Sequence, residues 1–297
     1  MSTNIDDLVI ESLLSVGGNN VATSTQNVVS VKLNPGTGEF SSIKAAVDSI
    51  TTASQSNPFL VSVGPGVYTE DTITMKPYVL VRGAGFDQTI IQVNATTKHV
   101  MLGSAYSGVS DCLLTGATSS GYSAIYYSST IAGGMFSARL IKFGNNDTQV
   151  IAEGLTYTSG VIVDACRLGS GYQFNYGFIA KGSAPGKILC KNIDVGSLSE
   201  PYPVEVFAAI STGSEIIVSS VQINSGTVST GNCVRISNGG KLRGSAFYVK
   251  GFSKGVWVEN VGGAPTLAVV GTSFENCTQD LVIDHPNTVG AFVGSAD

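Results

Sequence analysis

Short apolar runs recur along most of the chain at a regular interval. Each run has four to six residues, and Gly, Ser, Thr and Asn separate it from the next run. The units formed by these runs begin at residues 108, 134, 160, 187, 215, 241 and 266. Successive starts are therefore 25 to 28 residues apart. Runs of this length between turn-forming residues predict two or three β-strands in each unit.

The length of the repeat selects one architecture among the repeat folds. A propeller blade needs roughly 40 residues or more, and the Leu/Asn consensus of leucine-rich repeats is absent. The pattern predicts an all-β fold, a single-stranded right-handed parallel β-helix (solenoid) of about eight or more coils that stack about 4.8 Å apart. Alternate residues should point inward. Examples are Val161, Val163, Ile216, Val218, Phe247 and Val249.

An amphipathic helix is predicted at about residues 41–55, before the repeat. Ser41 or Ser42 is expected to cap its first turn. The apolar residues that share one face of this helix are Ile43, Val47 and Ile50. Because an open first coil would expose its core, we expect the helix to cover that coil.

Two regions follow from these patterns. Residues 1–30 lie outside the repeat and are expected to form an N-terminal arm, and residues 31–297 are expected to form the β-helix domain, with repeat coils at about 78–290. Residues 284–297 contain no second lid. We therefore expect a partner chain, or a further part of a longer protein, to cover that end.

Composition narrows the classes of function. Glycine makes up 36 of the 297 residues, and charged residues make up only 12%. We expect glycine to turn the corners of the coils. A net charge of −5 argues against nucleic-acid binding, and no apolar stretch approaches the roughly 18 residues of a membrane span. The N-terminal residues MSTNIDDLVIESLL lack the basic and apolar regions of a classical signal peptide.

The cysteines and histidines predict no metal site. The sequence has no CxxC pair and only two histidines, so we expect no metal and no cofactor. Each cysteine lies in or beside an apolar run, which favours buried free thiols. These cysteines are Cys112, Cys166, Cys190, Cys233 and Cys277.

A segment near the N-terminus carries a family resemblance. VKLNPGTGEFSSIKAAVDSI contains a GxGxF-like turn and then a helix, and FLVSVGPGVYTEDTITMKPYVLVRGAGFDQTII contains a buried strand, a GxYxE turn at Gly66–Glu70 and a glycine loop before T-x-I. In this order residues 31–92 resemble the opening of pectin methylesterases and other pectin-lyase-like β-helix proteins. The resemblance implies the fold. It does not specify the reaction, because β-helix proteins without enzymatic activity share this opening.

The catalytic strings that the resemblance would imply are absent. The esterases need two aspartates and an arginine in their own sequence contexts, and Gln279–Asp280–Leu281 is the nearest string. The lyases carry W-I-D-H, for which the sequence has Val282–Ile283–Asp284–His285 without the acidic, calcium-binding cluster. Polygalacturonase strings are also lacking. Enzymatic activity is therefore uncertain, and the balance is against it.

Three aspartates fall near the first strand of separate units. Asp111, Asp164 and Asp194 would need to approach within about 5–9 Å of one another to act as a glycosidase pair. Their offsets within the units differ, however, and Arg139 and Arg167 lie where they would pair with them. We therefore interpret these carboxylates as surface ion pairs and turn caps.

Aromatic residues cluster between residues 122 and 176 and are the candidate binding residues. Exposed aromatic rings bind the faces of sugars and also form subunit interfaces. The sequence leaves both roles open, together with simple packing in turns. The candidate residues are Tyr122, Tyr126, Tyr127, Tyr157, Tyr172 and Tyr176.

The sequence favours a non-enzymatic structural or attachment protein of a virus or phage particle, such as a tail, fibre or spike component. We expect a homotrimer or contacts with other particle subunits, a position on the particle surface, and binding of a cell-surface glycan. The viral assignment is an analogy at the level of the fold. The alternative is a lyase, hydrolase or esterase that acts on an acidic polysaccharide, and a bacterial surface adhesin is a third interpretation.

Overall fold

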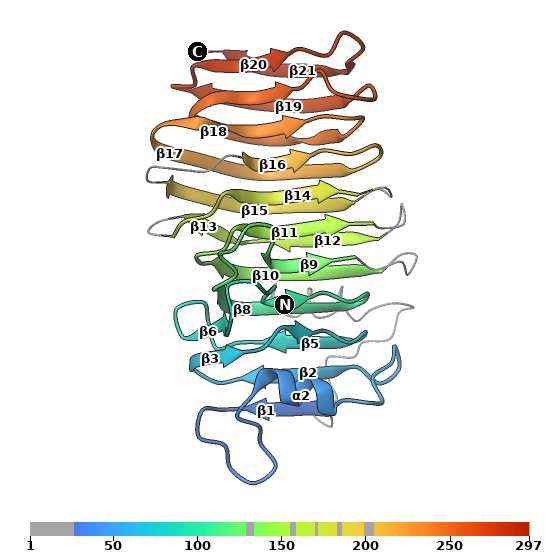
Figure 1. Ribbon diagram of the computed structural model, residues 1–297, viewed down its shortest axis with the longest axis vertical. Coiled ribbons are helices and arrows are strands. Elements are labelled where there is room, and N and C mark those ends of the chain that lie inside the picture. The colour runs from blue at the N-terminus through green and yellow to red at the C-terminus, as the bar shows by residue number, and fades with distance from the viewer. Residues whose placement is uncertain are drawn as a thin grey trace, which may run out of the picture.

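The chain forms a parallel β-helix whose coils stack along one long axis (Figure 1). The computed structural model describes residues 27–128, 134–154, 159–169, 172–182, 186–198 and 205–296. Within these residues, every pairing between named strands is parallel. The predicted fold class is therefore confirmed.

The strands form three faces, which we call A, B and C in the order in which each coil visits them. Face A consists of β1 (Val28–Val31), β2 (Phe59–Val63), β5 (Val79–Arg82), β12 (Gly160–Asp164) and the first parts of the longer strands β8 (Ser107–Thr115), β10 (Met135–Phe143), β15 (Lys187–Leu198), β17 (Glu215–Ile236), β18 (Lys241–Val258), β19 (Thr266–Glu275) and β21 (Val289–Ala296). From β8 to β19, each face A strand begins within one residue of a predicted unit start. The repeat in the sequence is thus one coil of the solenoid.

Faces B and C complete each coil. Face B consists of β3 (Gly66–Glu70), β6 (Thr89–Val93), β13 (Arg167–Gly169) and the later parts of β8, β10, β15, β17, β18, β19 and β21. Face C consists of β4 (Ile73–Thr74), β7 (Met101–Leu102), β9 (Ser123–Tyr127), β11 (Thr148–Glu153), β14 (Tyr176–Lys181), β16 (Glu205–Ala209), β20 (Gln279–Ile283) and the last parts of β17 and β18.

One residue with a left-handed backbone turns the chain from face A to face B. These corner residues have φ between 51° and 65°, and they are Asp111, Leu140, Ala165, Asn192, Ser220, Ala246 and Gly271. The expectation that glycine turns the corners is wrong at this corner, where only Gly271 is a glycine. A non-glycine residue in this conformation costs roughly 1–2 kcal/mol. The continuous ladder bonds on both sides of the corner offset that cost.

The interior of the solenoid is apolar and closely packed. The predicted inward residues Val161, Val163, Ile216, Val218, Phe247 and Val249 are all at most 1% exposed. Phenylalanine rings from successive coils contact one another, and Phe178 stacks on Phe207 with a centroid distance of 5.2 Å. Burial of one such side chain contributes about 1.5–3 kcal/mol. The core therefore stabilises the stack of coils along its whole length.

The predicted lid is present as α2 (Ile43–Ser49), which packs against β1, β2, β3 and β4. The helix is shorter than the predicted span of 41–55. It ends at Ser49, and the N–H of the next residue, Ile50, donates to the carbonyl of Val47. The Ser42 side chain accepts the N–H of Ala45. The GxYxE segment, predicted as a turn, is strand β3. Its last residue, Glu70, accepts the N–H of Ile43 at 2.6 Å. This strand thus anchors the lid to the first coil.

The β-helix begins earlier in the chain than the prediction placed it. Strand β1 already pairs with β2 at Val28, so the solenoid includes residues that the prediction placed in the arm. Residues 1–26 lie outside the described residues, and the arm stays a prediction.

Four cysteines are buried and free, as predicted, while Cys277 is partly exposed. Burial raises the pKa of the Cys166 thiol to about 12. Within the described ranges, we find no helix with the length and apolarity that a membrane crossing requires.

Candidate functional site

Face C carries a row of outward-facing positions that crosses most of its strands. In register, the row consists of Tyr126, Ile151, Ile179, Ala208, Arg235, Trp257 and Val282. The middle of the row is apolar, and its residues Ile151, Ile179 and Ala208 are at most 8% exposed. Aromatic and charged side chains therefore gather on either side of this apolar middle.

The N-terminal side of the row is an aromatic cluster around His99. The His99 ring stacks on Tyr126 with a centroid distance of 4.7 Å and lies tilted against Tyr122 at 5.2 Å. Its Nδ1 accepts the backbone N–H of Ser123 at 3.0 Å. Burial lowers the pKa of His99, and the charge of Lys181 lowers it further. These interactions favour the neutral ring with its proton on Nε2.

The C-terminal side of the row is a cluster of charges centred on Arg235. The Arg235 Nε and Nη2 atoms donate to Glu259 Oε2 at 2.9 and 2.7 Å, and Nη1 donates to Glu205 Oε1 at 3.2 Å. Glu205 begins β16, Arg235 lies near the end of β17, and Glu259 directly follows β18. The guanidinium group therefore ties three successive coils together.

Burial raises the pKa values of two groups in this part of face C. Glu205 is 4% exposed, and this burial raises its pKa, with Arg235 acting in the opposite direction. Burial also raises the pKa of Tyr176, the register neighbour of Glu205 on β14. A carboxyl group with a raised pKa suits general acid chemistry. Here, however, the Glu205 carboxylate is enclosed and hydrogen-bonded to Arg235, which assigns it a structural role.

Trp257, in the same coil as Glu259, links this cluster to Asp284 of the next coil. The Lys254 ammonium lies 3.8 Å from the centroid of the indole ring, and the Arg235 guanidinium lies 5.7 Å from it. The indole Nε1 donates to Asp284 Oδ2 at 2.8 Å. Cation–π contacts and this hydrogen bond fix the ring against the face.

The structure separates the predicted aromatic residues. Tyr122 and Tyr126 meet at His99, and Tyr176 neighbours Glu205. Tyr127 is completely buried, and its hydroxyl donates to the carbonyl of Gly134 at 2.6 Å, so it belongs to the core and not to an exposed aromatic surface.

The other two predicted tyrosines do not join this group. Tyr172 lies in the chain before β14, a strand of face C. Its ring lies 5.6 Å from the Lys142 ammonium of face B. Tyr157 lies outside the described residues. A role of the exposed tyrosines in binding stays a prediction.

The ion pairs predicted for the candidate aspartates are found only in part. Arg139 Nε lies 3.8 Å from Asp164, as the sequence predicts. The predicted pairing of Arg167 is wrong, because within the described residues no carboxylate lies within 4.0 Å of its guanidinium group. Asp284 accepts the Trp257 indole N–H, and the His285 Nδ1 accepts the N–H of Asn287 at 3.2 Å in the turn after β20. The V-I-D-H string thus supplies partners that hold the last described turns together.

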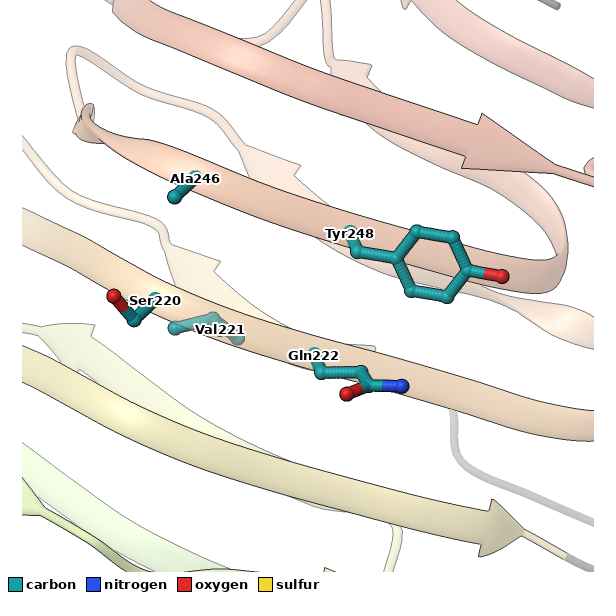
Figure 2. Close-up of a pocket in the computed structure, with 5 residues that line it drawn as sticks. All are labelled: Ser220, Val221, Gln222, Ala246 and Tyr248. Atoms are coloured by element: carbon teal, nitrogen blue, oxygen red, sulfur yellow. The ribbon is translucent and has the colours of Figure 1, made fainter.

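Face B has a shallow open hollow between β17 and β18. Its lining residues are Ser220, Val221, Gln222, Ala246 and Tyr248. Figure 2 shows the Gln222 and Tyr248 side chains projecting side by side from the two strands. Tyr248 in turn donates to Glu275 of the next coil. The hollow therefore presents amide and hydroxyl groups beside an aromatic ring.

Comparison with known proteins identifies the fold. No protein-family model and no curated protein matches the sequence. The structure is similar to pectin methylesterase from carrot, with 12% identity, a TM-score of 0.50 and coverage of 93% of this chain and 89% of that chain. It is also similar to ORF18 of Geobacillus virus E2, with 12% identity and a TM-score of 0.55. That match covers 86% of this chain and 57% of the viral chain. The fold is that of the pectin-lyase-like β-helix proteins.

Sequence reasoning missed the cluster around Arg235. The second apolar runs of three units, VEVFAAIS, NCVRISN and KGVWVEN, contain Glu205, Arg235, Trp257 and Glu259. Aligning these runs by their alternation places Ala208, Arg235 and Trp257 in one outward row, as the register shows. The alternation within the repeat therefore already indicated that these side chains lie in one row.

Proposed function

We propose that the protein is a non-enzymatic structural and attachment component of a virus or phage particle, in which the solenoid forms a shaft. Several copies, most simply three, would associate, and an exposed face of the solenoid would bind glycans on a cell surface. In this proposal the chain belongs to a tail, fibre or spike at the particle surface.

The observation that carries the proposal is the fold likeness to ORF18 of a Geobacillus virus over 86% of this chain. The ion pairs and hydrogen bonds of face C also support this proposal. Arg235, Glu205 and Glu259 bond to one another across three coils, and Trp257 is fixed by Asp284 and Lys254. Groups held in this way stabilise the stack of coils.

An enzyme acting on an acidic polysaccharide is the second candidate. The likeness to carrot pectin methylesterase favours it, as does the presence of two carboxylates and an arginine on one face. Against it, Glu205 is enclosed and bonded to Arg235, and the esterase and lyase strings are absent from the sequence.

One sample can decide between these candidates. Size-exclusion chromatography with light scattering measures the oligomeric state, and the same sample is incubated with a panel of acidic and neutral polysaccharides. We expect a stable oligomer that releases neither reducing ends nor 4,5-unsaturated products. A monomer that releases product, and loses that activity in the Glu205→Gln and Glu259→Gln variants, would overturn the proposal.

A further inference from the structure

A group of aromatic and charged side chains on face B lies apart from the clusters of face C. It consists of Phe86 and Asp87 from the loop between β5 and β6, Lys142 on β10, Arg167 on β13, and Tyr172, and we call it the Arg167 cluster. Lys142 and Arg167 are register neighbours in adjacent coils. A loop from an earlier coil thus brings its ring and its carboxylate to two later strands.

Of the two cations of the cluster, Lys142 is paired with a carboxylate and Arg167 is not. The Lys142 ammonium lies 3.2 Å from the Asp87 carboxylate, and the rings of Phe86 and Tyr172 lie 6.0 and 5.6 Å from it. Arg167 is exposed, and within the described part of the chain no carboxylate lies within 4.0 Å of its guanidinium group. Asp194, its register neighbour in the next coil, forms no ion pair with it. The cluster therefore keeps one uncompensated positive charge.

The Arg167 guanidinium is also oriented. It lies over the Phe86 ring with a distance of 5.4 Å to the centroid. Stacking on a ring restrains a planar guanidinium group while its N–H groups stay available at the edge, where a carboxylate or sulfate can accept two of them. An arginine held in this way loses less rotamer entropy when it binds an oxyanion.

The surroundings fit a sugar that carries the oxyanion. Tyr172 is partly exposed, and an aromatic ring next to a cation suits the apolar face of a pyranose. The outward row of face B continues from Arg167 through Asp194 and Gln222 to Tyr248, with one residue from each coil. Because adjacent strands are about 4.8 Å apart, this row offers hydrogen-bonding groups at regular intervals up to the hollow of Figure 2.

We infer that face B binds an oxyanion-bearing saccharide, with the carboxylate or sulfate at Arg167 and the sugar chain along the row towards Gln222 and Tyr248. This inference rests on the attachment role proposed above and specifies its ligand. It assigns binding to face B and leaves face C as the stabilising face.

Calorimetric titration tests the inference with three hexasaccharides: one of uronic acid units, one with a neutral backbone bearing O-sulfates, and the same backbone without sulfate. We expect the wild type to bind at least one of the charged probes and the uncharged probe at least about tenfold more weakly. Arg167→Ala should lower affinity for the charged probe about tenfold or more. Arg167→Lys should restore only part of it, because an ammonium lacks the planar fork.

Arg243→Ala is the matched control. Arg243 is another exposed arginine of the solenoid, but its Nε lies 3.3 Å from Glu215. Its removal should leave the affinity unchanged, and unfolding midpoints verify that every variant is folded. Equal binding of charged and uncharged probes, equal losses in Arg167→Ala and Arg243→Ala, or no binding of any probe would overturn the inference. None of these results changes the light-scattering and product assays, so a failure here is distinct from failure of the structural proposal.

Discussion

On face C, Arg235 is held by two carboxylates that approach it from neighbouring coils, and one of them is almost completely buried. On face B, Arg167 lies over an aromatic ring and is exposed, with no carboxylate within 4.0 Å in the described ranges. Both arginines lie in outward-facing rows of the β-helix, Arg235 on face C and Arg167 on face B. Their surroundings nevertheless give them different energetic roles.

The difference follows from desolvation. Removing one partner from a buried ion pair leaves a charge without compensation, which costs several kcal/mol. An exposed arginine remains hydrated, so its removal costs little. A charge of the first kind stabilises the fold, and a charge of the second kind is available to a ligand. The contrast between the faces can therefore be tested by measuring stability.

The largest effect is expected for Arg235→Ala. This change leaves the Glu205 and Glu259 carboxylates facing each other without a cation, and we expect the free energy of unfolding to fall by about 3 kcal/mol. Urea unfolding followed by circular dichroism at pH 7 measures it. In the control Arg243→Ala, the exposed Arg243 is lost from its pair with Glu215, which keeps Lys187 as a partner at 3.5 Å, so the loss should stay below about 1 kcal/mol. Equal losses in the two variants would contradict the assignment of a stabilising role to face C.

A smaller effect is expected from the pH dependence of Glu205. Burial raises its pKa in the folded state, so between the ordinary carboxyl value and the raised value the folded chain binds more protons than the unfolded chain. The stability contribution of this group is therefore greatest below that window and falls as pH rises through it. The difference in unfolding free energy between wild type and Glu205→Gln, measured from pH 4 to pH 8, isolates this group. We expect wild type to lose stability relative to the variant as pH rises.

The exposed carboxylates make that difference measurement necessary. Hydrogen bonds with Lys98 and Lys32 lower the pKa values of Asp71 and Glu39 respectively, and such groups make stability rise with pH. They contribute equally to wild type and to Glu205→Gln and cancel in the difference. A difference that changes in the opposite direction would show that Arg235, and not burial, dominates at Glu205.

The coil repeat was predictable because its signals are local. Alternation and turn residues placed the unit starts within one residue of the face A strands from β8 to β19. The corner conformation was not predictable in this way. Leu140 and Ala165 have no intrinsic preference for positive φ, and the strands paired on both sides of each corner impose it. The helix α2 also ends earlier than predicted, at Ser49, where the backbone of Ile50 is already extended.

The candidate site was predictable only in part, because its contacts join residues 24 to 30 positions apart. The burial of Tyr127 could have been predicted, since it shares the inward parity of Ile125 in the run SAIYY. The meeting of Phe86 with Arg167 could not. It depends on the path of the loop between β5 and β6 over later coils, which no pattern in the repeat specifies.

The smallest effect on stability is expected for Arg167→Ala, the change that should most affect binding. The residue is exposed, and within the described ranges its guanidinium group has the Phe86 ring as its one interaction partner, so we expect the free energy of unfolding to change by no more than about 0.5 kcal/mol. Urea unfolding at pH 7 measures this beside Arg235→Ala. A loss as large as that of Arg235→Ala would mean that Arg167 holds the loop of Phe86 onto face B. Both arginines would then be structural, and the contrast between the faces would disappear.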